Sequence, residues 1–293
     1  MATNQQRREA AKRKLERQLV RRAEQAKRRK IVGAGVVGGV VLIVAGLVVW
    51  IVNSGGSGDQ QATPPPSSSA PPVPSVTNIP TERTALPKRS KALPNPTTCS
   101  YAADTSGRPP SAKKVAVPDG KNVSSSGTVN FTLKTTQGDI PMTLDRSLAP
   151  CTVQAIESLA KQGFYTDTIC HRLGVTGLQM LQCGDPDAKG DITTDGTGGP
   201  GFTVPDEFID TAKYGRGILA MAKGTAPNSG GSQFFMVYGD APLDPAYSIF
   251  GSISDEGLKV LDKIARNGIG TVSPRDGTGE PKQPVKITAV TVS

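Results

Sequence analysis

Two neighbouring side chains in the middle of the chain have the chemical means to act on a substrate. His171 is the only histidine among the 293 residues, and Arg172 follows it directly. Apolar residues surround the pair, where a charged side chain is normally avoided because its burial is costly. An arginine in such a stretch is most often a structural cation paired with a carboxylate, and on this pattern alone we expect that role for Arg172.

The segments that resemble metal or cofactor sites are incomplete, so neither a metal nor a cofactor is expected. No CxxC pair accompanies His171, and no GxSxG turn of a serine hydrolase is present. Glycines at 196, 198 and 201 formally match a dinucleotide-binding fingerprint, but Phe202-Thr203-Val204-Pro205 follows instead of a helix. The acidic stretch from Asp185 lacks the twelfth-position carboxylate of a calcium loop, where Gly196 stands.

The positive charge of the chain lies in its N-terminal tail. The formal net charge is +9, and residues 1–30, with 12 Lys/Arg against 3 Asp/Glu, carry all of it. The remaining residues balance, so the folded part lacks the electrostatic attraction that drives binding to a phosphate backbone. We therefore expect no nucleic-acid binding by the folded part.

The first 127 residues are predicted to form a membrane-anchoring arm. Residues 1–30 have the pattern of a charged helix with a narrow apolar stripe, and residues 31–52 contain no charge. As a helix at about 1.5 Å per residue, the uncharged segment reaches about 33 Å, enough to cross a bilayer. The basic cluster before it predicts a cytoplasmic N-terminus, with everything after residue 52 outside the membrane. A disordered Pro/Ser-rich linker over 53–98 and an extended lead-in segment over 99–127 are expected to follow.

The remainder, residues 128–293, has the pattern of a mainly β domain. Val129, Phe131 and Leu133 alternate with polar residues, and the alternation resumes at Ile140 after a turn, which predicts a β-hairpin. Many strands with two short helices favour a closed, mainly antiparallel β-barrel capped by those helices. The helices are expected over 152–162 and 257–265, and further strands over 168–173, 179–183, 217–222, 233–238, 248–253 and 285–292.

Five segments of this domain carry an ordered set of motifs. They are Cys170-His171-Arg172, Met180-Leu181-Gln182-Cys183-Gly184-Asp185, Gly196-Thr197-Gly198-Gly199, Pro227-Asn228-Ser229-Gly230-Gly231-Ser232-Gln233-Phe234-Phe235, and Leu243-Asp244 followed by Phe250-Gly251. Together they resemble the cyclophilins, a family of peptidyl-prolyl cis-trans isomerases. The layout of basic tail, single anchor and Pro-rich linker is similar to that of membrane-anchored actinobacterial cyclophilins. The resemblance implies an eight-stranded cyclophilin-like barrel.

The resemblance also gives Arg172 a catalytic task that needs no proton transfer. Resonance holds an X-Pro bond planar with a barrier of about 18–20 kcal/mol. An arginine that donates to the prolyl nitrogen stabilises the twisted state, in which this nitrogen is pyramidal and basic. By the resemblance, Arg172 and Gln182 are the catalytic residues, with Gln182 orienting Arg172. The substrate-binding residues that it implies are His171, Gln179, Met180, Ala222, Lys223, Gln233, Phe235, Leu243 and Tyr247, and for His171 a purely structural, hydrogen-bonded role stays open.

The chain departs from the family pattern beside the expected pocket. Two residues are inserted around 174–177, and Gln179 falls where the family usually places a pocket phenylalanine. Leu178 could take the place of that phenylalanine. Pro242 stands where animal cyclophilins have the tryptophan linked to cyclosporin binding, so weak cyclosporin binding is expected.

Four cysteines follow the expected membrane segment: Cys99, Cys151, Cys170 and Cys183. In an oxidising setting they are expected to form disulfides, and four cysteines allow three pairings, which the sequence leaves open. Strand alternation would place Cys170 on the face of Arg172 and Cys183 on the face opposite Gln182. The thiols of Cys170 and Cys183 are therefore expected to point apart.

The leading functional hypothesis is a membrane-held prolyl isomerase that assists the folding of exported proteins on the outer side of the cytoplasmic membrane. Its partners would be proline-containing polypeptides. The alternative is a tethered module that binds such segments with little turnover, which Gln179 and the loop insertions favour.

Overall fold

The computed structural model describes residues 74, 76, 78–108 and 111–293. The expected tail helix and the expected membrane segment lie outside these residues, as does most of the expected linker. None of the helices in the described part of the chain is both long and apolar enough to cross a bilayer. The described residues belong to one compact unit, which contains the whole of the expected β domain.

The predicted hairpin is confirmed and lies near one end of the main sheet. β2 (Thr128–Thr135) and β3 (Gly138–Asp145) pair antiparallel along their full length. Their buried residues alternate with exposed or half-buried ones, because successive side chains of a strand point to opposite faces. The buried side chains of the two strands face the core: Val129, Phe131, Leu133, Ile140, Met142 and Leu144.

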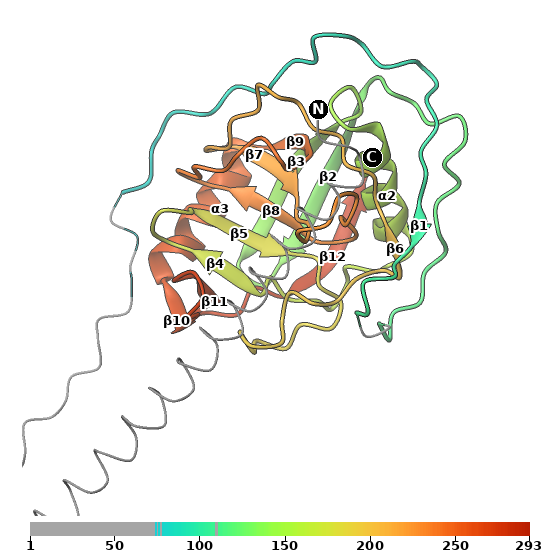
Figure 1. Ribbon diagram of the computed structural model, residues 1–293. Coiled ribbons are helices and arrows are strands. Elements are labelled where there is room, and N and C mark those ends of the chain that lie inside the picture. The colour runs from blue at the N-terminus through green and yellow to red at the C-terminus, as the bar shows by residue number, and fades with distance from the viewer. Residues whose placement is uncertain (1–73, 75, 77, 109–110) are drawn as a thin grey trace, which may run out of the picture. The chain divides into compact units, whose positions relative to one another are not determined.

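The main sheet has ten strands, every neighbouring pair antiparallel (Figure 1). Its order is β10-β11-β4-β5-β8-β7-β9-β3-β2-β12, so the mainly β class is confirmed with more strands than the eight expected. Closure of this sheet into a barrel stays a prediction. The remaining strands are β4 (Arg172–Gly174), β5 (Met180–Cys183), β7 (Ile218–Met221), β8 (Phe234–Val237), β9 (Ile249–Ile253), β10 (Ile269–Val272), β11 (Gly279–Pro281) and β12 (Ile287–Val292).

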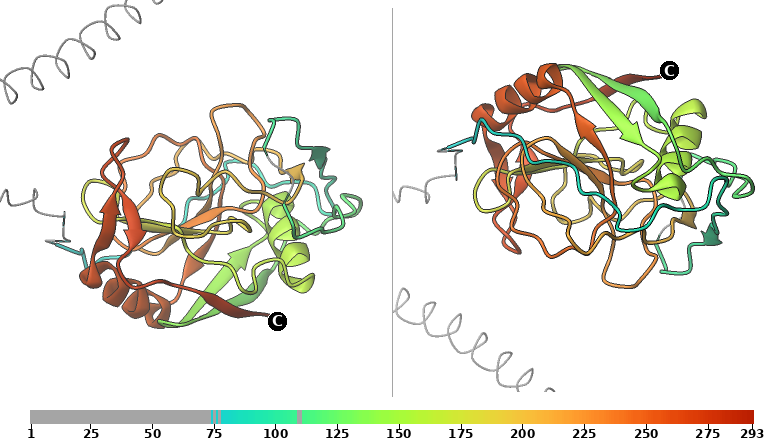
Figure 2. Two further views of the ribbon diagram at one scale, coloured as in Figure 1. Left: turned by 90° about the horizontal axis from the view of Figure 1, so that it is seen from below. Right: turned by 90° about the horizontal axis from the view of Figure 1, so that it is seen from above.

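Both predicted helices are confirmed, each beginning two residues before its expected start. α3 (Asp255–Asn267) begins conventionally, with the Ser254 hydroxyl accepting a hydrogen bond from the Gly257 N–H at 3.0 Å. Acidic residues in its first turn and a basic residue in its last turn complement the helix dipole. The two helices lie at opposite ends of the β2–β3 hairpin (Figure 2).

The first turn of α2 (Pro150–Lys161) is capped from a distant part of the chain. Its N-cap residue is Ala149, which has no polar side chain. The Glu207 carboxylate instead accepts hydrogen bonds from the N–H groups of Cys151 and Thr152, at 3.0 and 2.8 Å. Burial raises the pKa of Glu207, while these hydrogen bonds and Arg89 oppose that shift. Two backbone donors that the helix cannot satisfy itself are thereby paired.

The expected linker is packed against the folded domain from residue 78 onward. We call residues 78–98 the strap; it passes over the top of the domain in Figure 1 and crosses in front of it in the right-hand view of Figure 2. Thr84 N–H donates to the Arg216 carbonyl at 2.8 Å, and Arg89 Nη2 donates to the Leu148 carbonyl at 2.6 Å. Composition predicted a free spacer here because the segment has few apolar residues. Hydrogen bonds to loop carbonyls nevertheless hold it, and Ile79 and Leu86 pack against the core.

The lead-in segment, residues 99–127, is tied to the domain covalently and by strand pairing. Cys99 and Cys151 form a disulfide that joins its start to α2. β1 (Ala102–Ala103) pairs antiparallel with β6 (Phe202–Thr203) in a separate two-stranded sheet. Thr97 and Val123 also form a bridge, so the segment returns to the strap before β2 begins.

The cap from Glu207 predicts a loss of stability when its carboxylate is removed. We expect Glu207→Ala to lower the free energy of unfolding by about 1–3 kcal/mol, because the Cys151 and Thr152 N–H groups lose their partner. Urea denaturation of the variant and the wild type measures the difference. The neighbouring Asp210 is exposed, and Asp210→Ala should change the value by no more than about 0.5 kcal/mol. Equal losses in both variants would contradict the capping role.

Candidate active site

Strands β4 and β5 set the central pair of the site side by side. Arg172 lies directly opposite Gln182 in the antiparallel register. Leu173 and Leu181, their neighbours in the chain, are fully buried in the core. Because side chains alternate between the two faces of a strand, Arg172 and Gln182 project from the same face, away from the core.

A chain of side-chain hydrogen bonds holds the arginine in one orientation. Arg172 Nη1 donates to Gln182 Oε1 at 2.9 Å, and Gln182 Nε2 donates to Gln233 Oε1 at 2.9 Å. Gln233 Nε2 donates in turn to the Gly198 carbonyl oxygen at 2.8 Å. Each side-chain amide uses both its oxygen and its nitrogen, so neither glutamine can flip its amide without losing two hydrogen bonds.

The other side of the guanidinium is held by the loop between β10 and β11. Arg172 Nε donates to Thr278 Oγ1 at 3.0 Å, and Arg172 Nη2 forms an ion pair with Asp276 Oδ2 at 2.8 Å. The carboxylate partner expected for this arginine is therefore present, but the Arg172 side chain is 32% exposed rather than buried. A guanidinium has five N–H donors, and the contacts within the described residues use three of them. Two donors remain for a ligand.

A cavity of about 220 Å³ opens beside this guanidinium, and we call it the Met180 cavity. Met180 and Phe235 are 1% and 5% exposed, so its inner wall is apolar and rigidly packed. Eight of the eleven predicted site residues line it, and Leu178 completes the lining. The eight are Arg172, Met180, Gln182, Ala222, Lys223, Phe235, Leu243 and Tyr247.

Tyr214 supports this cavity and was not predicted from the sequence. Its hydroxyl donates to the Tyr247 carbonyl at 2.7 Å and accepts from the Tyr247 N–H at 3.0 Å. The Tyr247 ring in turn packs edge-on against Phe235, with 5.4 Å between ring centroids. Burial raises the pKa of Tyr214 to about 12, so its hydroxyl keeps the proton that it donates. No motif marks Tyr214, because the contact joins residues 33 positions apart.

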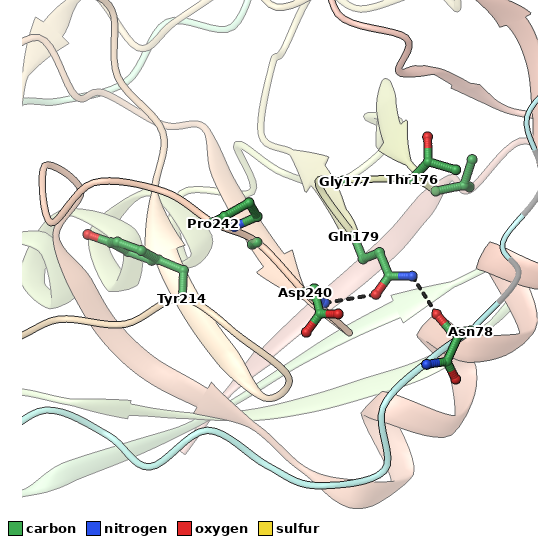
Figure 3. A pocket seen from close by; sticks show the side chains of 9 residues that line it. Asn78, Thr176, Gly177, Gln179, Tyr214, Asp240 and Pro242 are labelled. Carbon is green, nitrogen blue, oxygen red and sulfur yellow. Dashed lines mark hydrogen bonds between the residues drawn. The ribbon is translucent and has the colours of Figure 1, made fainter.

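Gln179 does not line the Met180 cavity, contrary to the prediction. Its side-chain Nε2 donates to the Asn78 carbonyl at 2.6 Å, and its Oε1 accepts the Asp240 N–H at 2.8 Å (Figure 3). It lies at an adjoining cavity of about 540 Å³, which we call the Gln179 cavity and which Tyr214 and Pro242 also line. The residue therefore anchors the beginning of the strap rather than a ligand in the Met180 cavity.

The inserted residues around 174–177 explain why Leu178, and not Gln179, lines the Met180 cavity. The Leu178 N–H donates to the Thr176 carbonyl at 2.7 Å, so the chain turns tightly just before β5. The Leu178 carbonyl then lies so close to Gly174 that any side chain there would collide with it. The turn brings Leu178 to the Met180 cavity in the place expected for the pocket aromatic, and Gln179 faces the other way.

His171 is buried and lines neither the Met180 cavity nor the larger cavities beside it. Neither ring nitrogen has a hydrogen-bond partner among the residues that the structure describes, so the satisfied structural role is not seen either. Burial lowers the pKa of His171; the carboxylates of Asp185 and Asp195 oppose this shift, and Arg172 adds to it. The ring is thus a neutral packing element directly before β4.

Cys170 and Cys183 form a disulfide, which corrects the expectation that their thiols point apart. That expectation extended strand alternation from Arg172 back to Cys170, but β4 begins only at Arg172. The irregular step at His171 returns Cys170 to the core, where Cys183 also lies. With the Cys99–Cys151 bond, the described residues contain no free cysteine.

Lys223 and Gln182 also border a third cavity, of about 390 Å³, which we call the Arg108 cavity. Lys223 Nζ forms an ion pair with Asp206 at 3.2 Å and lies 4.9 Å from the centre of the Phe208 ring. Gln233, which does not line the Met180 cavity, lines this one. All predicted site residues except His171 and Gln179 therefore face one cleft formed by the Met180 and Arg108 cavities.

The cleft has the chemistry of a binding site with a fixed cation. Across residues 74, 76, 78–108 and 111–293, no three His, Cys, Asp or Glu side chains gather closely enough to hold a metal ion. A guanidinium with two available donors and an apolar recess beside it suits a ligand that combines a small ring with a peptide group.

Comparison with known proteins places these features in a family. Residues 129–292 match the family model described as cyclophilin type peptidyl-prolyl cis-trans isomerase/CLD. The chain is 42% identical over 181 residues to a probable peptidyl-prolyl cis-trans isomerase B of Mycobacterium leprae, covering 56% of this chain and 59% of that protein. It is 42% identical over 200 residues to a protein of the same name from Mycobacterium tuberculosis, covering 62% of each. The chain thus spans between 59% and 62% of the length of these curated relatives.

A solved structure is also similar. The crystal structure of a Cryptosporidium parvum cyclophilin type peptidyl-prolyl cis-trans isomerase is 28% identical to this chain, with a TM-score of 0.47. The match covers 57% of this chain and 98% of that one.

The buried His171 predicts a loss of stability at acidic pH. Its pKa is lowered by folding, so below about pH 6.5 the unfolded chain binds a proton that the folded chain does not, and stability falls as pH falls through that value. We expect wild type to lose about 1 kcal/mol more unfolding free energy between pH 7.5 and 5.5 than His171→Phe, which keeps a buried ring without nitrogens. Urea denaturation at both pH values measures this, and identical losses would contradict it.

Proposed function

Because the chain belongs to the cyclophilin-type peptidyl-prolyl cis-trans isomerase family, we propose that it catalyses the cis-trans isomerisation of X-Pro bonds in polypeptides. One observation carries the proposal: the Arg172 guanidinium lies at a cavity of about 220 Å³ whose inner wall is formed by Met180 and Phe235, with two of its donors unused by the described residues. The cavity takes the proline ring, and the guanidinium donates to the prolyl nitrogen.

The barrier arises from amide resonance, so lowering it requires a partner for the twisted bond rather than a nucleophile. In the twisted state the prolyl nitrogen regains its lone pair and becomes a good acceptor. A donor aimed at this nitrogen stabilises the twisted state more than the planar ground states, which is the condition for a faster reaction. Arg172 remains charged at any physiological pH, so this donor is always available.

The fixed orientation of Arg172 matters because a donor that must reorient during the reaction loses part of its benefit. The Gln182–Gln233 chain on one side and Asp276 with Thr278 on the other hold the guanidinium before substrate arrives. Such preorganisation is the main source of electrostatic stabilisation in enzymes. Met180, Phe235 and Leu243 meanwhile hold the proline ring, so that the carbonyl side of the bond rotates.

Closure of the main sheet belongs to the same proposal, because it would stiffen the strand that carries Arg172. Cys170 N–H donates to the Val285 carbonyl at 2.9 Å, and Ile287 N–H donates to the Thr168 carbonyl at 2.8 Å. These bonds join the segment just before β4 to the start of β12 at the far end of the sheet order, which supports a closed barrel.

The assay that tests the activity measures kcat/KM for isomerisation of an X-Pro peptide by the full-length chain. We expect Arg172→Ala to lower kcat/KM by about 100-fold or more, because the donor to the prolyl nitrogen is lost. Arg172→Lys should recover little, since a lysine cannot make the same three contacts. Arg266 is exposed on α3, and Arg266→Ala should retain wild-type activity. A wild-type rate in Arg172→Ala would overturn the assignment.

A binding module with little turnover is the second candidate. The ion pair with Asp276 favours it, because a carboxylate at 2.8 Å partly neutralises the guanidinium that must serve as donor. The same assay separates the two. Proline-peptide binding without measurable isomerisation by wild type would support the module, and a clear rate that Arg172→Ala removes would exclude it.

We also propose that the chain is anchored in the cytoplasmic membrane with the folded part outside, where it acts on exported proteins. The uncharged segment over 31–52 and the basic tail before it support this orientation. Two disulfides in the folded part suit an oxidising compartment. Cyclosporin binding is expected to be weak, because Pro242 borders the Gln179 cavity where a tryptophan would be needed.

Membrane fractionation tests the location. We expect the full-length chain to sediment with membranes and to resist carbonate extraction, and a variant lacking residues 31–52 to be extracted. In cells with a permeabilised wall, added protease should digest the folded part while the N-terminal tail stays protected. Protection of the folded part, with the membrane intact, would contradict the proposed orientation.

A further inference from the structure

Arg108 reaches the cleft from outside the part of the chain that matches the family model. It belongs to the lead-in segment, whereas the match begins at residue 129. Its side chain lines the Arg108 cavity, whose wall of Gln182, Ala222 and Lys223 is shared with the Met180 cavity. A peptide seated with its proline in the Met180 cavity therefore has a neighbouring residue at the Arg108 cavity.

The lead-in segment holds Arg108 in place at several points. Asp104 N–H donates to the Gly201 carbonyl at 3.0 Å, next to the β1–β6 pairing. Arg108 Nε lies 3.4 Å from the Asp104 carboxylate, and Arg108 Nη2 donates to the Ser229 carbonyl at 3.1 Å. The side chain is 23% exposed, so it is positioned by the protein rather than extended into solvent.

One nitrogen of this guanidinium is left for a ligand. Within the described residues, Arg108 Nη1 donates no hydrogen bond. It lies against two glycines: a Cβ at Gly199 would be 3.1 Å from Nη1, and a Cβ at Gly231 would be 3.7 Å from it. The absence of side chains at these two positions leaves the room that the guanidinium occupies.

The charges that line the Arg108 cavity are all positive. Arg108 and Lys223 are its charged residues, and among the residues described no Asp or Glu lines it. Each cation has a carboxylate partner, Asp104 and Asp206, but neither partner belongs to the lining. A ligand group in this cavity of about 390 Å³ thus meets two cations at close range.

We propose that the Arg108 cavity is a specificity subsite for an acidic side chain, Asp or Glu, placed one or two residues from the isomerised proline. Arg108 binds the carboxylate through Nη1, and Lys223 adds attraction from the wall shared with the Met180 cavity. The subsite rests on the proposed isomerase function, since that function places the peptide in the cleft. It makes Arg108 a determinant of which X-Pro bonds are processed.

The test compares peptides in which the residues beside X-Pro are Glu, Gln or Lys, with the full-length chain and its variants. We expect wild type to show about tenfold higher kcat/KM for the Glu peptide than for the Gln peptide, as suits a charge-assisted hydrogen bond, and a lower value for Lys. The preference should shrink with rising salt, because the subsite is partly exposed. Peptides with Glu before or after the proline show in which direction the bound peptide runs through the cleft.

Variants of Arg108 show whether a preference for Glu comes from this residue or from the overall charge of the protein. We expect Arg108→Gln to remove most of the preference for Glu over Gln, and Arg108→Glu to reverse the preference in favour of Lys. Arg266→Gln removes the same charge from an exposed position on α3 and should keep the wild-type preference. An unchanged preference in Arg108→Gln, or none in wild type, would overturn the proposal.

Binding measurements keep the two proposals distinguishable. If wild type processes no peptide, the isomerase function fails, and calorimetric affinities for the Glu, Gln and Lys peptides still decide whether the subsite exists. If the Gln peptide is processed but Glu brings no gain in rate or affinity, the subsite fails while the isomerase function stands. Thermal unfolding of the Arg108 variants shows whether they fold. If the variants do not fold, the comparison of the Glu, Gln and Lys peptides on the wild type alone decides whether the subsite exists.

Discussion

The hydrogen-bond chain from Arg172 through Gln182 and Gln233 to the Gly198 carbonyl is the constraint on which the cleft depends. It links three stretches of chain, around β4 and β5, before β8, and in the glycine-rich loop. Each amide is used at both ends, so the guanidinium has one supported orientation. The sheet register, the loop position and the shape of the cleft must therefore agree, and an error in any of them would leave a polar group unpaired.

The second organising feature is the stretch of chain that precedes the family domain. The strap and the lead-in segment pack apolar side chains such as Ile79 and Leu86 against the core. They also reach two of the cavities, with Asn78 at the Gln179 cavity and Arg108 at the Arg108 cavity. Backbone hydrogen bonds, the Cys99–Cys151 bond and the β1–β6 pairing hold them. Surface segments of this kind vary more readily than the elements that they cover, so these two can change the lining of the cavities while the sheet stays the same.

The site places a positively charged side chain beside an apolar recess, and the protein supports each of the two in a different way. Arg172 stays partly exposed and paired with Asp276, which spares the domain the cost of burying an isolated cation. Phe235 and Met180 are buried and packed against Tyr214 and the sheet, so the recess beside the cation keeps its shape. Tyr214 supports the recess through Tyr247, and Asp276 supports the cation Arg172. Each of these contacts joins residues more than 30 positions apart in the sequence.

Local patterns in the chain were enough for the hairpin, both helices and the mainly β class, because side-chain period depends only on local backbone geometry. The ordered motifs likewise predicted Arg172, Gln182 and Phe235 as site residues. These three lie on the regularly paired strands β4, β5 and β8, which bring them to one cleft. Tertiary structure alone decided the Cys170–Cys183 pairing, the exchange of Gln179 for Leu178, and the arrival of Asp276 and Arg108. Each of these depends on an irregular step, a tight turn or a loop, where alternation no longer applies and position is set by contacts distant in sequence.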